Sequence, residues 1–440
     1  MPQPIRLGLI AVASPLEMGA GDALALLARL EEAFRAPGSP PIETAGRIVV
    51  TGSAAAVVAG RAFYDQRVDA VVAIAASLFE DYLVLDLLEE CSVPVVAWAR
   101  PGMETGALCG MQQLCFMLKQ LGRPYLFLFD EPAAGDAAVR ARAFIAAAGL
   151  ARQLRRARIG HLGHRVEGMT ETTAHELALK RTFGPRVVGL DTQGFLERAA
   201  QVDVLPLATD WQALGGQVGR VTATAEAGIA SLQVVHALRA TVAELGLSAV
   251  SIGCYPHLMG KVCLAASLLG EEGVPVACEG DVNAALGMLM LTRLTSQPVH
   301  NTDLLDPISA ENAIVFSHCG SGGFSLAESP AEITLGPVRL MEHGLCCLFP
   351  ARPGPVTLLN IVPALGGHRM AALHGEAIVT DMVFPGNPLR VRFREDYRAI
   401  LAWIADQGLG HHWMAAYGDL RRPLADLAAM VGCECIGLGD

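Results

Sequence analysis

The stretch GVPVACEGDVNAALGMLMLTRLT, residues 273–295, places a short apolar run directly before a longer one. Residues 274–278 have the length and composition of a buried strand, and residues 283–294 have those of a helix. The acids Glu279 and Asp281 lie between them. A buried strand that passes through a short polar turn into a helix is the repeating unit of a parallel α/β sheet.

The same alternation fills much of the chain. Short β-branched runs alternate with segments whose apolar residues recur at helical spacing. Before residue 150 we expect strands at 5–13, 47–51, 70–75, 93–98 and 125–129 and helices at 21–34, 53–65, 82–91 and 108–121. A second series has expected strands at 157–162, 186–190, 249–254 and 312–317 and helices at 171–182, 224–245 and 260–269.

The pattern changes after about residue 325, where helical periodicity fades. Strands are expected at 356–361, 376–383 and 389–394, separated by Gly-Gly and Pro-Gly turns, with helices at 396–407 and 423–431. The predicted fold class is α/β: two doubly wound parallel-sheet domains followed by a β-rich, small barrel-like domain. The expected boundaries are 1–155, 156–325 and 326–440.

Composition limits the partners that this chain is expected to bind. The 440 residues carry a net charge of −11, and the basic run RQLRRAR at 152–158 is typical of a surface helix or linker, so no nucleic acid partner is expected. The longest apolar runs are strand-sized and the first residues lack a signal-peptide pattern, so no membrane is expected. The 11 cysteines form no CxxC pair, which is typical of reduced thiols in a cytoplasmic protein. The dinucleotide and P-loop fingerprints are absent.

Potential metal ligands follow successive strands of the second series. Glu279 comes just after residues 274–278, Asp303 follows one helix later, and His318 ends the expected strand 312–317. Open α/β sheets present ligands at the carboxyl ends of their strands. Acids beside apolar runs are costly unless their charge is compensated, and a divalent cation compensates it. Carboxylates with an imidazole suit Mn²⁺, Mg²⁺, Co²⁺ or Zn²⁺.

Each of these side chains also has a structural interpretation. Glu279 is compatible with an acid at a helix start, and Asp303 with an N-cap. His318 is compatible with a hydrogen-bonded core histidine. Asp281 and Asp306 are expected to be caps rather than ligands. The glycine-rich residues 320–323 either cradle an anion or form a plain turn.

A second polar cluster, GHHW, contains His411 and His412 near the end of the chain. Adjacent histidines point in different directions, so at most one of the two is expected to be a ligand. His368 and His374 are the competing candidates.

The sequence CEGDVNAALGMLMLTRLTSQPVHNTD, followed by SHCGSGG, resembles the core of the L-fucose isomerase and L-arabinose isomerase superfamily. The resemblance extends to GALCGMQQLCFMLKQLGRPY, RIGHLGHRVEGM and GHHWMAAYGDL. It implies two α/β domains, a β-rich domain and a divalent metal, typically Mn²⁺, held by Glu279, Asp303 and His412. His318 resembles a histidine that ligates metal in the arabinose branch. Gln112 and Gln113 in CGMQQ, together with His411, are the implied substrate contacts.

The resemblance implies an aldose–ketose isomerase acting on an open-chain sugar through an enediolate. Glu279 and Asp303 would then be catalytic acid/base groups as well as ligands. The implied protein is a homo-oligomer, trimeric or hexameric, with its pocket at a subunit contact. The chain is shorter than the L-fucose isomerases, and the sugar is not specified by the sequence.

Two other kinds of function fit the same residues. One is a lyase or aldolase acting on a sugar acid or sulfonated sugar through the same metal, in which Lys261 would bind the anionic group, although a solvated helix lysine is the more usual interpretation of that residue. The other is a non-catalytic sugar-binding protein. A mononuclear iron oxygenase is chemically compatible with two carboxylates and a histidine, but the resemblance gives it no support.

Overall fold

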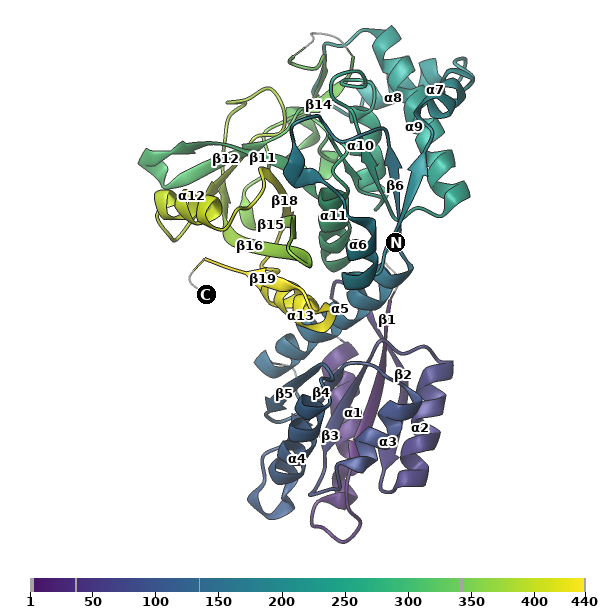
Figure 1. Ribbon diagram of the computed structural model, residues 1–440, viewed down its shortest axis with the longest axis vertical. Coiled ribbons are helices and arrows are strands. Elements are labelled where there is room, and N and C mark those ends of the chain that lie inside the picture. The colour runs from purple at the N-terminus through teal and green to yellow at the C-terminus, as the bar shows by residue number, and fades with distance from the viewer. Residues whose placement is uncertain (1–3, 36–37, 134, 341–343, 439–440) are drawn as a thin grey trace. The chain divides into compact units, whose positions relative to one another are not determined.

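The computed structural model describes residues 4–35, 38–133, 135–340 and 344–438. The chain forms two compact units (Figure 1). The amino-terminal unit comprises Pro2–Gln153 and Arg422–Gly432, and the site unit comprises Leu154–Arg421 and Cys433–Asp440. The three domain boundaries expected from the sequence stay predictions, because the second and third expected domains lie within one compact unit.

The amino-terminal unit contains a parallel five-stranded sheet in the order β2-β1-β3-β4-β5. Its strands are β1 (Ile5–Val12), β2 (Ile42–Val50), β3 (Ala70–Ala75), β4 (Val95–Ala99) and β5 (Tyr125–Phe129). Its helices are α1 (Ala23–Arg35), α2 (Ser53–Asp65), α3 (Tyr82–Glu90), α4 (Ala107–Gln120) and α5 (Asp136–Arg156). This order is a doubly wound one, as the strand–helix alternation predicts.

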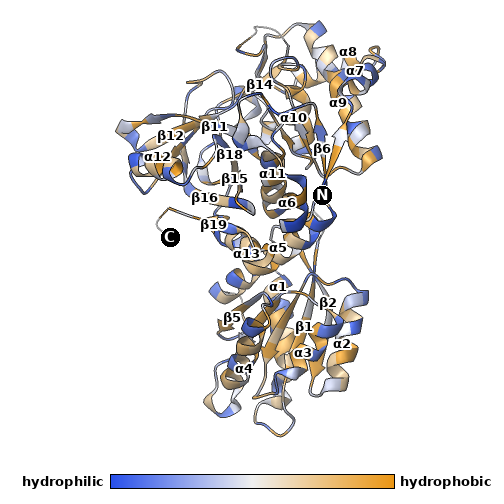
Figure 2. Cartoon of the chain, in the orientation of Figure 1, coloured by the Kyte–Doolittle hydropathy of each residue, from blue (hydrophilic) through white to orange (hydrophobic). Residues whose placement is uncertain are grey.

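Apolar side chains hold helices on both faces of this sheet. Residues of α2, α3 and α4 share one core cluster with β1, β3 and β4. Helix α5 packs closely on β1 at Gly149. A Cβ added to this glycine would lie only 2.8 Å from the side chain of Ile5. The strands of this sheet are the apolar layer seen in Figure 2. The alanine-rich α5 contains the basic run 152–156 at its end, so that run is part of a helix.

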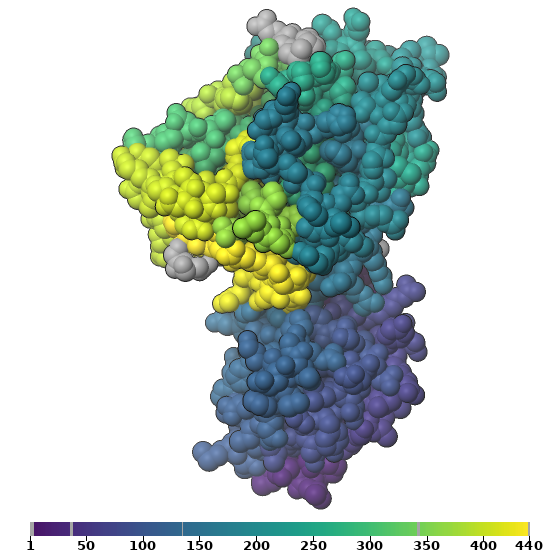
Figure 3. All heavy atoms as spheres, in the orientation of Figure 1, coloured from purple at the N-terminus to yellow at the C-terminus, as the bar shows by residue number. Residues whose placement is uncertain are grey.

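Helix α13 (Arg421–Val431), near the end of the chain, returns to the amino-terminal unit. The guanidinium of Arg140 on α5 donates two hydrogen bonds to the carboxylate of Asp426, at 2.6 and 2.9 Å. Figure 3 shows the yellow atoms of α13 against the blue atoms of α5. A bidentate pair of this kind fixes orientation as well as charge.

The site unit contains a parallel four-stranded sheet in the order β10-β9-β6-β7. Its strands are β6 (Arg158–Leu162), β7 (Arg186–Leu190), β9 (Ala249–Ile252) and β10 (Val276–Ala277). Its helices are α6 (Glu176–Thr182), α7 (Thr192–Ala200), α8 (Leu207–Gly215), α9 (Ala225–Leu245), α10 (Cys263–Glu271) and α11 (Val282–Thr295). A short three-stranded sheet contains β8 (Arg220–Val221), β13 (Thr334–Gly336) and β14 (Cys346–Leu348).

A third, mostly antiparallel sheet has the order β15-β18-β11-β12-β17-β16-β19, and β15 also pairs with β16. Six strands therefore close into a ring, the pairing expected of a small barrel. The strands are β11 (His300–Ile308), β12 (Ala313–Ser317), β15 (Gly354–Ala364), β16 (Gly367–Ile378), β17 (Leu389–Arg392), β18 (His412–Tyr417) and β19 (Glu434–Ile436), with helix α12 (Tyr397–Asp406) beside them. Figure 1 shows β11, β15 and β18 next to helix α11.

Three expectations from the sequence are wrong in detail. The expected strand 312–317 joins this third sheet, because four residues separate β12 from β11 and so short a connection makes antiparallel neighbours, not a parallel crossover. The expected strand 376–383 instead ends at Ile378, since β16 pairs along β15 from Gly367 onward. The expected helix 171–182 begins only at Glu176, after the tight turn Thr170–Thr172. None of the described helices is long and apolar enough to cross a bilayer.

Candidate metal centre

Three neighbouring strands bring distant polar side chains together. Strand β11 lies between β18 and β12, with Asp303 in register with His412 on one side and with Ser317 on the other. His318 follows Ser317 directly. Oδ1 of Asp303 consequently lies 3.5 Å from Nε2 of His412 and 3.8 Å from Nε2 of His318. Asp303 is therefore a strand residue, and the alternative interpretation as an N-cap is wrong.

Glu279 reaches the same point from the end of β10. Its backbone is left-handed, with φ of 60°, and its carbonyl accepts a hydrogen bond from Val166 at 3.3 Å. The next residue, Gly280, also has a positive φ of 72°, where a side chain would collide with the backbone of His164. A left-handed non-glycine residue costs roughly 1–3 kcal/mol and persists only where its surroundings hold it. This turn directs the Glu279 carboxylate to 3.3 Å from His412 Nε2 and 3.8 Å from His318 Nε2.

The facing atoms of these four side chains lack hydrogen-bond partners. Oε2 of Glu279, Oδ1 of Asp303 and Nε2 of both His318 and His412 are buried and unpaired. Leaving a buried polar atom unpaired costs about 1–3 kcal/mol, so four at one point call for a shared partner. The ligands of a single cation lie roughly 3 to 3.5 Å apart, close to the separations here. Glu279, His318 and His412 form one group able to hold a metal ion, and Asp303, His411 and His412 form another. The residues fit a divalent cation.

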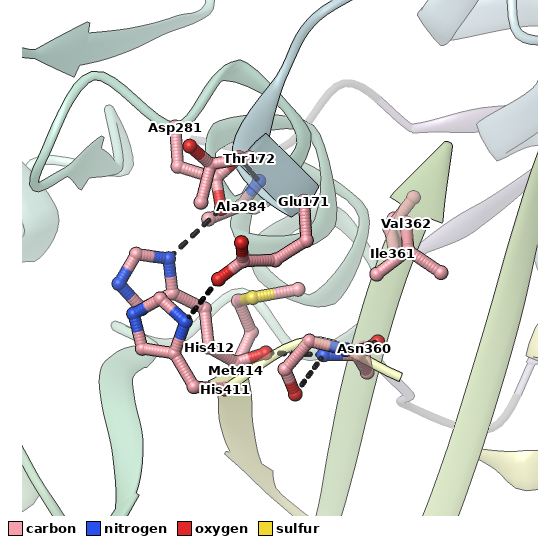
Figure 4. A pocket seen from close by; sticks show the side chains of 11 residues that line it. Glu171, Thr172, Asp281, Ala284, Asn360, Ile361, Val362, His411, His412 and Met414 are labelled. Atoms are coloured by element: carbon pink, nitrogen blue, oxygen red, sulfur yellow. Dashed lines mark hydrogen bonds and ion pairs between the residues drawn. The ribbon is translucent and has the colours of Figure 1, made fainter. Parts of the chain in front are cut away.

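A second layer of carboxylates orients the two adjacent histidines (Figure 4). Nδ1 of His412 lies 2.9 Å from Oδ2 of Asp281, and Nδ1 of His411 lies 2.6 Å from Oε1 of Glu171. With Nδ1–H donating to a carboxylate, the lone pair of Nε2 faces the centre, the usual arrangement for histidine ligands. Asn360 donates to the backbone carbonyls of Gly410 and His412, at 3.1 and 2.6 Å, and so fixes this part of the chain.

In this cluster, neighbouring groups of opposite charge shift pKa values in the direction opposite to the shift that burial causes. Burial disfavours a charged imidazole, yet Asp281 and Glu279 raise the pKa of His412 to about 9. Burial would also raise the pKa of Glu279, but His411 and His412 hold it well below its usual range. Burial lowers the pKa of His318, but Asp303 outweighs it and raises that pKa well above the ordinary value. In the absence of metal, protons on the imidazoles balance the carboxylates, and a cation would displace those protons.

A cavity of about 140 Å³ opens from this centre. Glu279, Asp303 and His318 line its polar end. The remaining lining residues are Met169, Cys254, Tyr255, Met259, Cys263, Cys278, Cys319, Arg339, Leu340 and Phe384. One enclosed water needs roughly 10–15 Å³ on the same scale, so the cavity has room for a small organic substrate.

The structure places the remaining residues that the sequence singles out, and most of them lie outside the metal centre. Asp281 is the N-cap of α11 as expected, accepting from Ala284 at 2.9 Å, whereas the expected cap Asp306 is a residue of β11 opposite Val315. His368 and His374 lie on β16, outside both ligand groups. Lys261 is exposed and does not line the cavity. The amide N–H of Gly322 donates to Asn387 at 2.9 Å, which favours the plain turn at 320–323.

Two expected residues lie outside the site unit, and three residues at the site are not indicated by the sequence. Gln112 and Gln113 lie on α4 in the amino-terminal unit, so their expected role in substrate binding stays a prediction. The sequence interpretation missed Glu171, Asn360 and Arg339. The sequence predicts a helix at Glu171, and no local pattern around Asn360 or Arg339 indicates a site.

Comparison with known proteins places this chain beside sugar isomerases. It is 25% identical over 378 residues to the sulfoquinovose isomerase of Alkalicoccus urumqiensis, covering 82% of this chain and 84% of the relative. It is 26% identical over 362 residues to that of Clostridium sp. (strain MSTE9), covering 78% and 80%, and 22% identical over 379 residues to that of Priestia aryabhattai, covering 84% and 85%. No model of a known protein family matches the chain. The similarity indicates an isomerase, and kinship with L-fucose isomerase itself stays a prediction.

Proposed function

We propose that this chain is a metal-dependent aldose–ketose isomerase that acts on an open-chain sugar, with sulfoquinovose as the first candidate substrate. That it is an enzyme, an intramolecular oxidoreductase, follows from its similarity to four sulfoquinovose isomerases. One observation carries the metal: the carboxylates of Glu279 and Asp303, each with a buried, unpaired oxygen, lie within 3.3–3.8 Å of the unpaired Nε2 atoms of His318 and His412. Two carboxylates with two imidazoles suit Mn²⁺, Mg²⁺, Co²⁺ or Zn²⁺, and Mn²⁺ is the first candidate because the family resemblance implies it.

The proposed reaction transfers a proton between C1 and C2 of the sugar. When bound, the cation would supply positive charge beside the carbonyl and hydroxyl oxygens, where negative charge develops in an enediolate. Glu279, kept ionised by its histidine neighbours, and Asp303, on strand β11, are the groups that accept the carbon-bound proton and return it.

His411 has a different role from His412 in this proposal. Its side chain is 33% exposed, and its Nε2 lies 3.9 Å from Oε2 of Glu279. The nearby carboxylates of Glu279 and Glu171 raise the pKa of His411, so this imidazole is suited to donating a hydrogen bond to a substrate oxygen. His412 is buried, and its Nε2 lies 3.3 Å from Oε2 of Glu279, as expected of a ligand.

The test uses NMR to monitor the interconversion of aldoses and ketoses by the protein. Purified protein is stripped with chelator, reloaded with Mn²⁺ and incubated with sulfoquinovose, its keto isomer and a panel of neutral aldoses and ketoses. Interconversion that depends on metal, with solvent deuterium entering at C2 in D₂O, is the expected result. Glu279→Gln should abolish turnover while circular dichroism stays unchanged. Wild-type activity in that variant would overturn the assignment of Glu279, and conversion without solvent exchange would favour a hydride shift.

The same experiment separates the other functions. Products with a shortened carbon chain would identify a lyase or aldolase. Tight sugar binding that chelator leaves unchanged, without conversion, would identify a binding protein. A homo-oligomer, trimeric or hexameric, is part of the proposal, and light scattering measures it.

A further inference from the structure

The cavity beside the metal centre has chemically different ends. Glu279 and His318 are largely buried, with side chains 13% and 2% exposed, so they lie at its closed end. Arg339 is exposed and therefore lies at its open end. Among the described residues that line the cavity, Arg339 is the one that carries a permanent positive charge. Between the two ends the lining is mostly thiol, thioether and aromatic.

Arg339 is oriented by an aromatic ring and not by an acid. Its guanidinium carbon lies 4.6 Å from the centre of the Phe384 ring, and Phe384 also lines the cavity. No described carboxylate pairs with Arg339. By contrast Arg398, which stacks on Tyr397 at 4.5 Å, also pairs with Asp396 at 3.7 Å. A guanidinium stacked by its face keeps its N–H edge available for an anion.

We propose that Arg339, stacked on Phe384, binds an anionic terminal group of the sugar and selects acidic sugars over neutral ones. This inference rests on the proposed isomerase function. A sugar whose carbonyl end reaches Glu279 and Asp303 would present its far end towards the open side of the cavity, where Arg339 lies. Sulfonate and phosphate both offer oxygens in the geometry that a guanidinium binds through two parallel hydrogen bonds. Arg339 thus takes the role for which the sequence suggested Lys261, which does not line the cavity.

The experiment measures kcat/KM for three sugars of matched skeleton: sulfoquinovose, glucose 6-phosphate and the neutral 6-deoxyglucose. Arg339→Gln should lower kcat/KM for sulfoquinovose by about 10- to 100-fold, mainly through KM, as expected for losing a hydrogen bond to a charged group. Activity on 6-deoxyglucose should not change. Arg339→Lys should recover part of the loss, because the charge remains without the planar fork. Arg398→Gln, which removes the other exposed stacked arginine, is the control and should leave all three substrates unaffected.

The outcomes distinguish this inference from the proposed function. If Arg339→Gln lowers kcat/KM equally for sulfoquinovose and glucose 6-phosphate, Arg339 recognises any terminal anion. If kcat/KM falls for sulfoquinovose alone, Arg339 recognises the sulfonate. Unchanged kcat/KM for sulfoquinovose in Arg339→Gln, or an equal loss on 6-deoxyglucose, overturns the role of Arg339. If the wild type converts none of the three sugars, the proposed function fails. In that case calorimetric titration tests the role of Arg339 separately from catalysis. The inference holds if Arg339→Gln weakens the binding of sulfoquinovose and leaves the binding of 6-deoxyglucose unchanged.

Discussion

Asp281 begins helix α11 with one carboxylate oxygen and holds the imidazole of His412 with the other. Oδ1 accepts from the backbone N–H of Ala284 at 2.9 Å, and Oδ2 lies 2.9 Å from Nδ1 of His412. The side chain is 5% exposed, so both contacts are protected from water. The cap that the sequence predicts is thus also the group that orients a candidate metal ligand from a distant strand.

Asp281→Asn separates these two roles. Asparagine is as good an N-cap as aspartate, so helix α11 should still begin at the same residue and the circular dichroism spectrum should stay unchanged. Its amide N–H₂ facing His412 would force the imidazole proton onto Nε2, the atom that faces Glu279. Loss of such a supporting contact typically weakens metal binding by about 10- to 100-fold. Calorimetric titration with Mn²⁺ measures the affinity, and wild-type affinity would contradict the role of Asp281.

Metal should stabilise the site unit against heat. A ligand that binds only the folded state adds about 2.7 kcal/mol at 100 times its Kd. For a unit of this size that corresponds to a rise in Tm of roughly 5–10 °C over chelator-treated protein. Scanning calorimetry with Mn²⁺ and with chelator measures the difference.

Asp303→Asn tests whether the stabilisation comes from the proposed centre. The substitution preserves shape and strand pairing but removes one ligand charge, so the rise in Tm with Mn²⁺ should largely disappear. Asp306→Asn, on the same strand and outside both ligand groups, is the matched control and should retain it. A full rise in Asp303→Asn would place the cation elsewhere.

The sequence predicts those parts of the fold whose signal is local. Helix α2 and strands β3, β5 and β7 have the expected ends, because periodic, β-branched or aromatic apolar runs bounded by clear breakers specify them. The sequence does not predict strand β11, since its acids and Pro307 have low strand propensity, and pairing on both sides stabilises it instead. The positions of Glu279 and His318 follow from strand ends. The residues alone leave His412 as one of several candidate histidines, and the family resemblance singles it out, because its neighbour Asp303 is brought to it by pairing between distant strands. No sequence pattern indicates Arg339 as a site residue, since its proposed role depends on the cavity that it lines.

His300 should make the folded protein sensitive to acid. Burial, helped by Arg352, lowers its pKa to about 3, against about 6.5 in an unfolded chain. Between these values the unfolded state binds the extra proton, so stability is complete above about pH 6.5 and is lost as the pH falls towards 3. Each pKa unit is equivalent to about 1.4 kcal/mol.

Substituting His300→Phe should flatten this pH dependence. The ring lies near Phe349 and Tyr417, and its Nε2 has no hydrogen-bond partner, so phenylalanine suits the position. Urea unfolding at pH 7 and pH 4.5 should show a smaller loss of stability in the variant than in the wild type. His257→Phe, at an exposed position, is the comparison and should keep the wild-type dependence. Equal losses in the His300 variant and the wild type would remove His300 as the cause.

Glu171→Gln tells which of the two adjacent histidines is the ligand. One possible ligand group contains His412 with Glu279 and His318, and the other contains both histidines with Asp303. If His411 acts on substrate, weakening its 2.6 Å contact with Glu171 should lower kcat by about tenfold, the effect of one charge-assisted hydrogen bond, with Mn²⁺ affinity unchanged. Asp281→Asn should show the opposite pattern, with affinity lost first. If Glu171→Gln weakened Mn²⁺ binding as much as Asp281→Asn does, His411 would itself be a ligand, because a partner at Nδ1 affects metal affinity only through the nitrogen that binds the metal.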